Sequence, residues 1–120
     1  MLVSVIIPTY NGQHTLARAI NSVLDQRGDF DVEILVCDDC SEDRTVSIAR
    51  TFGCRVLINP AHTGGPNAGR NRGIKAARGD FIAFLDQDDE WLPGKLQLQI
   101  DKMNEGYDVV STGKLVRHES

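Results

Sequence analysis

The sequence predicts an α/β fold, in which helices flank a mostly parallel sheet. Short apolar segments typical of buried strands alternate with segments whose apolar residues recur at helical spacing. Such alternation implies βαβ units with right-handed crossovers, and therefore a Rossmann-like parallel sheet. The 120 residues suffice for one core, so residues 1–120 are expected to form a single domain.

Composition and charge describe a globular chain. Hydrophobic residues make up 41% and charged residues 25%. The formal net charge of -4 argues against nucleic acid as the main partner, because phosphate binding needs a basic face. No apolar run approaches the roughly 20 residues of a membrane helix, and the apolar start lacks the basic region of a signal peptide. We expect a cytoplasmic protein and leave open a peripheral association with the inner face of the membrane.

The first half of the chain is predicted to contain three strands and two helices. Residues 2–7 form an apolar strand that Pro8 should end, because proline donates no ladder hydrogen bond. Four apolar residues at helical spacing predict a helix over 13–26. The remaining elements are a strand over 32–37, a helix with an N-cap among residues 41–43 that runs through Phe52, and a strand over 55–58.

The second half begins with a loop of turn residues, 59–67, which we expect to be mobile. A helix over 67–77 follows, and we interpret its basic residues Arg72, Lys75 and Arg78 as a solvated face. The later elements are a buried strand over 81–85, a helix from Pro93 to about Gly106, and a fifth strand over 107–112, whose exposed edge should favour self-association.

Ligand-type residues follow three of the predicted strands. They are Pro8-Thr9-Tyr10, Asp38-Asp39 and Asp86-Gln87-Asp88-Asp89. The carboxyl ends of parallel strands line the ligand site of such sheets, so these residues should share one crevice. Clustered carboxylates suit a hard divalent cation that also bridges to phosphate, and the alternative is a solvated acidic turn. An aromatic face, acceptors and a metal cluster together suit a nucleotide.

The cysteines and histidines carry no clear chemistry. Three cysteines without an export signal argue against a disulfide framework. The pair Cys37 and Cys40 straddles a strand end, which disfavours a thioredoxin-like motif, and no fourth ligand for zinc is evident. We interpret Cys37 as a core residue, and His14, His62 and His118 as surface residues.

Four segments together resemble the family 2 glycosyltransferases of the GT-A fold. They are Ser4–Asn11, Glu33–Ser41, Arg70–Gly73 and Phe84–Asp89, in the family's order and with its usual spacing. The resemblance implies a metal-dependent, inverting enzyme of cell-envelope polysaccharide synthesis. Such an enzyme transfers a sugar from a nucleotide-sugar donor, usually a UDP-sugar, to a glycan, lipid or protein acceptor. The sugar and the nucleotide base stay open.

The resemblance also assigns roles to the loops after the first and second strands. Pro8, Thr9 and Tyr10 would cradle the nucleotide, with Tyr10 stacking on the base. Asp39 would accept a hydrogen bond from the base, and Asp38 would lie near the ribose.

Further roles fall on the later loops. Arg70 would lie near the base, and the backbone at Gly64 and Gly65 would approach the nucleotide. Asp86-Gln87-Asp88 matches the D-x-D motif. Asp88 would be the main ligand of Mn²⁺ or Mg²⁺, and Asp86 would face the ribose and the metal.

Two features depart from the family's pattern. Cys40 stands where the family usually has glycine, which tolerates a left-handed backbone more easily. Family members are roughly twice as long, and their second half supplies the acceptor site and the catalytic base. We therefore expect the base beyond Ser120 and assign no catalytic residue here.

Two other functions are weighed against this one. The chain could be a non-catalytic nucleotide-binding module, or a subunit completed by a partner. A receiver-type phosphoacceptor domain also places acids at strand ends. It needs an aspartate at the end of its middle strand, where this chain has Asn59-Pro60.

Overall fold

The computed structural model describes residues 1–106, 109–110 and 115–117, and within them six strands form one sheet in the order β3-β2-β1-β4-β6-β5. Four strands are parallel and form the larger part of the sheet, and β6 and β5 add antiparallel pairs beyond β4. The α/β prediction is confirmed. The strands are β1 (Leu2–Thr9), β2 (Asp31–Asp38), β3 (Arg55–Ile58), β4 (Phe81–Phe84), β5 (Val109–Val110) and β6 (Leu115–Arg117).

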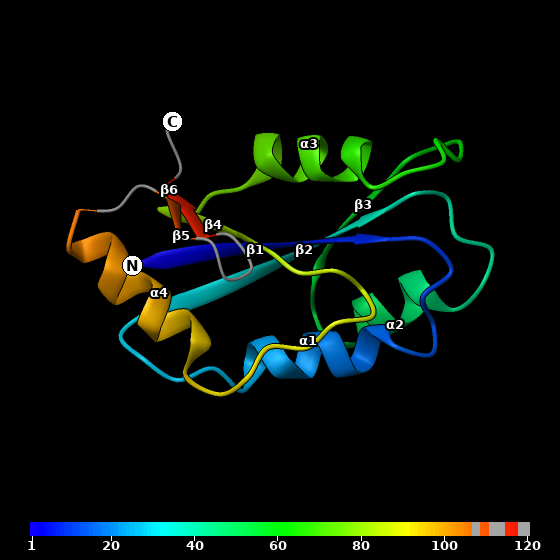
Figure 1. The fold of residues 1–120 in the computed structure, drawn as a ribbon. Coiled ribbons are helices and arrows are strands. Elements are labelled where there is room, and N and C mark those ends of the chain that lie inside the picture. The colour runs from blue at the N-terminus through cyan, green and yellow to red at the C-terminus, as the bar shows by residue number, and fades with distance from the viewer. Residues whose placement is uncertain (107–108, 111–114, 118–120) are drawn as a thin grey trace.

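Helices cover both faces of this sheet. Figure 1 shows α3 on one face and α1, α2 and α4 on the other. None of the helices in the described part of the chain is long and apolar enough to span a membrane. Their bounds are Leu16–Leu24 for α1, Thr45–Thr51 for α2, Asn67–Ala76 for α3 and Lys95–Asn104 for α4.

The first strand extends beyond Pro8, so the prediction that Pro8 ends it is wrong. Pro8 pairs in register with Cys37 of β2, whereas β4 pairs with β1 only as far as Ile6. The carbonyl oxygen of Ile6 accepts from the amide of Leu85, on the β4 side. Backbone groups alternate sides along a strand, so Pro8 faces that same side beyond the last bridge. Its missing N–H therefore interrupts no ladder.

The helices occupy their predicted positions but begin later than predicted in three cases. A turn precedes α1, in which the amide of Leu16 donates to the carbonyl oxygen of Gly12 at 3.0 Å. The second helix begins only at Thr45. Gly94, with φ 81, adopts the left-handed conformation immediately before α4, which excludes it and Pro93 from the helix.

The sheet contains one strand, β6, that the sequence patterns did not predict. β6 pairs with β4 and separates it from β5, which forms one edge of the sheet within the described residues. A strand of three residues is too short to show an alternation of polar and apolar side chains. The fifth strand predicted over 107–112 is described at Val109–Val110, and its other residues lie outside the described ones.

Alternate residues of β1 point to opposite faces of the sheet and divide the core in two. On the face of α1, α2 and α4, they join the larger cluster together with residues such as Leu16, Ala49 and Leu96. On the α3 face, the buried members of the smaller cluster are Ile6, Leu35, Cys37 and Ile82.

Two glycines allow α3 to lie close to the sheet. A Cβ atom at Gly73 would lie 2.7 Å from Cγ2 of Ile6, and one at Gly69 would lie 3.2 Å from the carbonyl oxygen of Cys37. The helix therefore approaches the strands through its backbone, because a side chain at Gly73 would overlap Ile6. This close packing fixes the place of Arg70, the residue after Gly69, at the carboxyl end of the strands.

A cluster around Glu33 fastens the other end of α3. Its Oε2 accepts from Ser4 Oγ at 2.5 Å and from the Arg78 amide at 2.7 Å, and its Oε1 pairs with Arg55 Nη1 at 2.9 Å. Arg55 also donates to the carbonyl oxygen of Ala76, the last residue of α3. Partial burial acts to raise the pKa of Glu33, but these hydrogen bonds and the Arg55 charge together lower it.

We predict that Glu33 makes stability depend on pH in acid. A carboxyl group with a lowered folded-state pKa stabilises the fold above its ordinary value of 4.5, and this contribution is lost as the pH falls through the folded-state value. Wild type should therefore exceed Glu33→Gln in free energy of unfolding at about pH 7, and the excess should shrink by about pH 3. Urea denaturation at both pH values measures this.

The control for this measurement is Glu42→Gln, which changes an exposed glutamate. Its difference from wild type should stay small at both pH values. If wild type exceeded Glu33→Gln by the same free energy of unfolding at both pH values, the carboxylate charge would not stabilise the cluster.

Candidate functional site

The loops after β1, β2 and β4 meet at the carboxyl edge of the sheet around one cavity of about 470 Å³. A second cavity of about 790 Å³ shares Arg70 and Asp86 and extends to Trp91 and Lys95. The smaller cavity brings together eight of the nine predicted site residues: Pro8, Thr9, Tyr10, Asp39, Arg70, Asp86, Gln87 and Asp88. Gly64 and Gly65, from the loop before α3, also line it.

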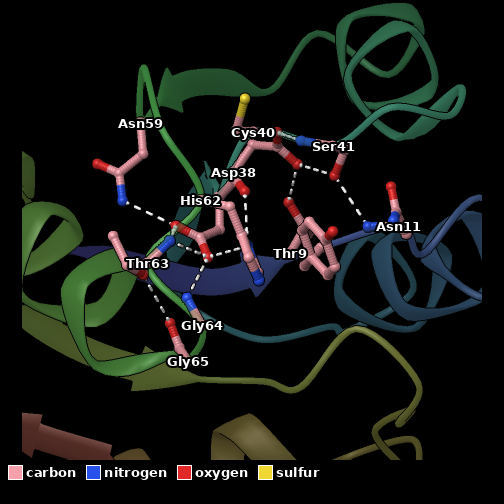
Figure 2. Close-up of polar contacts among 12 residues, drawn as sticks. Thr9, Asn11, Asp38, Cys40, Ser41, Asn59, His62, Thr63, Gly64 and Gly65 are labelled. Atoms are coloured by element: carbon pink, nitrogen blue, oxygen red, sulfur yellow. Dashed lines mark hydrogen bonds and ion pairs between the residues drawn. The ribbon is translucent and has the colours of Figure 1, made fainter.

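Asp38, the ninth predicted residue, is buried and does not line this cavity. Its Oδ1 accepts from Thr9 Oγ1 at 2.7 Å and Ser41 Oγ at 2.6 Å, and its Oδ2 accepts from the Ser41 amide at 2.8 Å (Figure 2). The carboxylate thus joins the end of β1 to the turn after β2. Contact between Asp38 and a ribose stays a prediction.

The next residue, Asp39, belongs to the cavity lining and binds the loop of residues 59–66, which we call loop 59–66. Its carboxylate accepts from the side chains of Asn59 at 3.0 Å and Thr63 at 2.8 Å, and it lies 2.8 Å from His62 Nδ1. The amides of Thr63 and Gly64 donate to it at 3.0–3.2 Å (Figure 2).

These donors stabilise the ionised form of Asp39. The hydrogen bond from Asn59 is the largest cause that holds its pKa well below the usual range. The bonds from Thr63 and Gly64 act in the same direction and outweigh desolvation, which acts to raise the pKa. Asp39 is therefore ionised at neutral pH and offers only hydrogen-bond acceptors to a ligand.

Two residues that the sequence analysis placed on the solvated surface have partners at or beside this site: His62 lines the cavity, and Arg72 contacts loop 59–66. His62 is partly exposed, but its ring stacks on Tyr10 with centroids 4.0 Å apart and an interplanar angle of 25°. Arg72 donates to the side-chain oxygen of Asn59, and Nδ2 of the same Asn59 donates to Asp39. The solvated interpretation of Arg72 is therefore wrong. One sequence feature could have placed His62 at the site: its ring belongs to a loop that was expected to approach a nucleotide.

Gln87, the middle residue of the D-x-D segment, pairs with the backbone of Tyr10. Its Oε1 accepts from the Tyr10 amide at 2.9 Å, and its Nε2 donates to the Tyr10 carbonyl oxygen at 3.0 Å. These two hydrogen bonds join the loop after β4 to the loop after β1. Gly12 leaves room for the Gln87 side chain, which a Cβ atom at that position would overlap.

Asp86 and Asp88, the predicted metal ligands, are exposed carboxylates at the cavity. Arg70 Nη2 lies 3.3 Å from Asp86 Oδ1. Within the described residues, no three His, Cys, Asp or Glu side chains come together as a metal-binding group. Two carboxylates nevertheless fit Mg²⁺ or Mn²⁺ in a nucleotide site, because such ions take one or two carboxylates and complete their shell with phosphate oxygens and water.

Cys40 adopts the left-handed conformation that glycine favours, with φ 64. The departure from the family's glycine therefore falls on a turn that keeps the glycine-type backbone. Cys37 is buried as predicted, and burial raises its pKa to about 11, so the thiol is protonated at neutral pH. Both cysteines are free, and these features give no support to a redox pair.

Comparison with known proteins identifies the family. The glycosyl transferase family 2 profile matches residues 4–119, and the chain belongs to this family. It is 41% identical over 122 residues to the GalNAc(5)-diNAcBac-PP-undecaprenol beta-1,3-glucosyltransferase of Campylobacter jejuni. It is 43% identical over 104 residues to the UDP-Glc:alpha-D-GlcNAc-diphosphoundecaprenol beta-1,3-glucosyltransferase WfgD of Escherichia coli.

Solved structures agree with this assignment. The crystal structure of S. aureus TarS 1-349 in complex with UDP-GlcNAc matches with a TM-score of 0.83 and 33% identity, over 91% of this chain and 33% of that one. The GT-A fold is thereby confirmed. The alignments with the C. jejuni and E. coli proteins cover 97% and 85% of this chain, but only 39% and 41% of those relatives.

We predict that Asp38 stabilises the fold. Asp38→Ala leaves the Thr9 hydroxyl and both donors of Ser41 without their acceptor, in a place from which water is largely excluded. The free energy of unfolding should fall by about 1–3 kcal/mol, measured by urea denaturation. Asp89→Ala, which removes an exposed carboxylate, is the control and should change it little. Equal effects of the two substitutions would contradict a structural role for Asp38.

Proposed function

We propose that this chain forms the donor-binding part of an inverting, metal-dependent glycosyltransferase that uses a UDP-sugar. The observation that carries the proposal is the meeting of Tyr10, Asp39, Arg70 and the D-x-D segment at one cavity. The names of the relatives support the nucleotide, since WfgD is named for UDP-Glc and the TarS structure contains UDP-GlcNAc.

The cavity offers the contacts that a uracil base requires. Tyr10 supplies an aromatic ring in the cavity lining, its side chain is exposed, and aromatic faces favour offset stacking. Asp39 is an ionised acceptor for the imide N–H of uracil, a hydrogen bond that is strengthened by the carboxylate charge. Cytosine has no N–H at that ring position, so the same acceptor would discriminate against it.

The carboxylates and Arg70 would serve the diphosphate side of the donor. We propose that Asp88, with Asp86, holds Mn²⁺ or Mg²⁺, and a bound ion of this kind neutralises a diphosphate leaving group. Arg70 lies at Asp86 and adds a fixed positive charge beside it. Gln87 keeps these groups in register with Tyr10, because it bonds to both backbone polar groups of that residue.

The acceptor is proposed from the relatives. Two of them are named for acceptors linked to undecaprenol through a diphosphate, so we propose a lipid-linked glycan acceptor and work at the inner face of the membrane. Inversion requires a base that deprotonates the acceptor hydroxyl. We place this base in the part of the relatives that the present chain does not cover.

A calorimetric titration of UDP tests the donor site. We expect binding that strengthens when Mn²⁺ is present, because the ion bridges the carboxylates and the diphosphate. Asp88→Asn should lose the Mn²⁺-dependent part, whereas Asp101→Asn, an exposed carboxylate on α4, should keep it. UDP binding that is indifferent to Mn²⁺ and to Asp88→Asn would contradict the metal assignment, and no UDP binding at all would contradict the proposed function.

A further inference from the structure

Loop 59–66 occupies both surfaces that the proposed function gives to the nucleotide base. His62 covers the ring of Tyr10, and loop groups donate to the carboxylate of Asp39. Asn59, His62, Thr63 and Gly64 all contact this carboxylate, and Figure 2 shows these four residues close together. The loop and a base would therefore compete for the same two residues.

The carboxylate of Asp39 has no acceptor left for a ligand. Its Oδ1 receives Asn59 Nδ2 at 3.0 Å, Thr63 Oγ1 at 2.8 Å and the Thr63 amide at 3.1 Å. Its Oδ2 receives the same amide at 3.0 Å and the Gly64 amide at 3.2 Å, and it lies 2.8 Å from His62 Nδ1, which also lies 3.3 Å from the Asp39 carbonyl oxygen. A carboxylate offers about four lone-pair sites. A base N–H can bond to Asp39 only after a loop donor has left.

The stacking distance leads to the same conclusion at Tyr10. A base inserted between two rings needs a stacking distance on each side, on the order of 7 Å between the outer rings in total. The Tyr10 and His62 centroids are 4.0 Å apart, so no base fits between them. A base that stacks on this face of Tyr10 must replace the imidazole ring.

The loop is also held in a way that permits this exchange. Residues 60–67 are all exposed, so little apolar burial fixes them. The contacts found between loop 59–66 and the rest of the described chain are mainly polar. Apart from those to Asp39 and Tyr10, they include the bond from Arg72 to Asn59 and a contact of 3.8 Å between Cys40 Sγ and the Pro60 carbonyl oxygen.

We propose that His62 is an internal competitor of the nucleotide base. Its ring stacks on Tyr10 and its Nδ1 faces the Asp39 carboxylate, which are the two contacts that a uracil ring would make through its face and its imide N–H. The inference rests on the proposed function, because it takes Tyr10 and Asp39 as the base-binding residues. His62 thus sets the affinity for the donor by holding the site in a self-occupied state.

This role predicts that removing the imidazole strengthens donor binding. The apparent affinity of a site is reduced by the fraction of molecules in which it is open, and His62→Ala raises that fraction. In a calorimetric titration of UDP with MnCl₂ present, His62→Ala should bind about tenfold more tightly than wild type. His14→Ala changes an exposed histidine outside the cavity lining and should bind as wild type does.

The result separates the competitor role from the more ordinary one. If His62 instead contacted the bound base, His62→Ala would weaken UDP binding. Weaker or unchanged binding therefore overturns the inference, while the proposed function stands. Tyr10→Ala should weaken binding in either case. If neither wild type nor His62→Ala binds UDP, the proposed function fails and the inference fails with it.

A second measurement uses wild type alone, so it does not depend on the folding of any variant. Amide hydrogen exchange at Thr63 and Gly64 should become faster when UDP and MnCl₂ are added, because their bonds to Asp39 are released. Retained protection of both amides in the UDP-saturated protein would overturn the inference.

Discussion

The buried carboxylate of Asp38 is the interaction on which the arrangement of the site depends. It accepts from Thr9 at the end of β1 and from Ser41 in the turn after β2. Hydrogen bonds to a charged group in a largely dry place are stronger than those between neutral groups. Asp38 thereby gives two separate loops one fixed geometry, and Gln87 adds the loop after β4 by pairing with Tyr10.

The adjacent residues Asp38 and Asp39 have different surroundings. Successive residues at a strand end point in opposite directions, so Asp38 turns inward and Asp39 reaches the cavity. The first is bonded to the residues that shape the loops. The second is bonded to loop 59–66, whose residues are nearly all exposed. A buried carboxylate that joins two loops and a carboxylate that lines the cavity thus lie one residue apart.

The sequence predicts the parallel part of the fold well because the signals there are local. Apolar runs mark β1, β2 and β4, and the polar residues after them, acidic for β2 and β4, point to the shared edge. β6 could not be predicted, since a strand of three residues has no period. The continuation of β1 through Pro8 depends on where β4 stops pairing, which only the assembled sheet defines.

In the candidate site, too, the residues with local sequence signals were predicted and those that depend on distant partners were not. Eight of nine predicted residues line the cavity, because each lies at the carboxyl end of β1, in a loop that follows a strand, or in the first turns of α3. His62 and Arg72 escaped prediction because their roles come from partners distant in sequence: Tyr10 and Asp39 for His62, and Asn59 for Arg72. The sequence around a single histidine or arginine contains no pattern that indicates such a distant partner.

The central proposal is that the cavity lined by Tyr10, Asp39 and residues 86–88 binds a nucleoside diphosphate together with a metal ion. Paramagnetic broadening of amide signals by Mn²⁺ in the NMR spectrum of the ¹⁵N-labelled chain tests it most directly. With UDP present, we expect broadening confined to the amides of residues 86–88 and their neighbours in the loop after β1, whereas Glu33 and Arg78 at the opposite edge stay sharp. Broadening that is the same with and without UDP, or that is spread over unrelated surface carboxylates, would contradict the account.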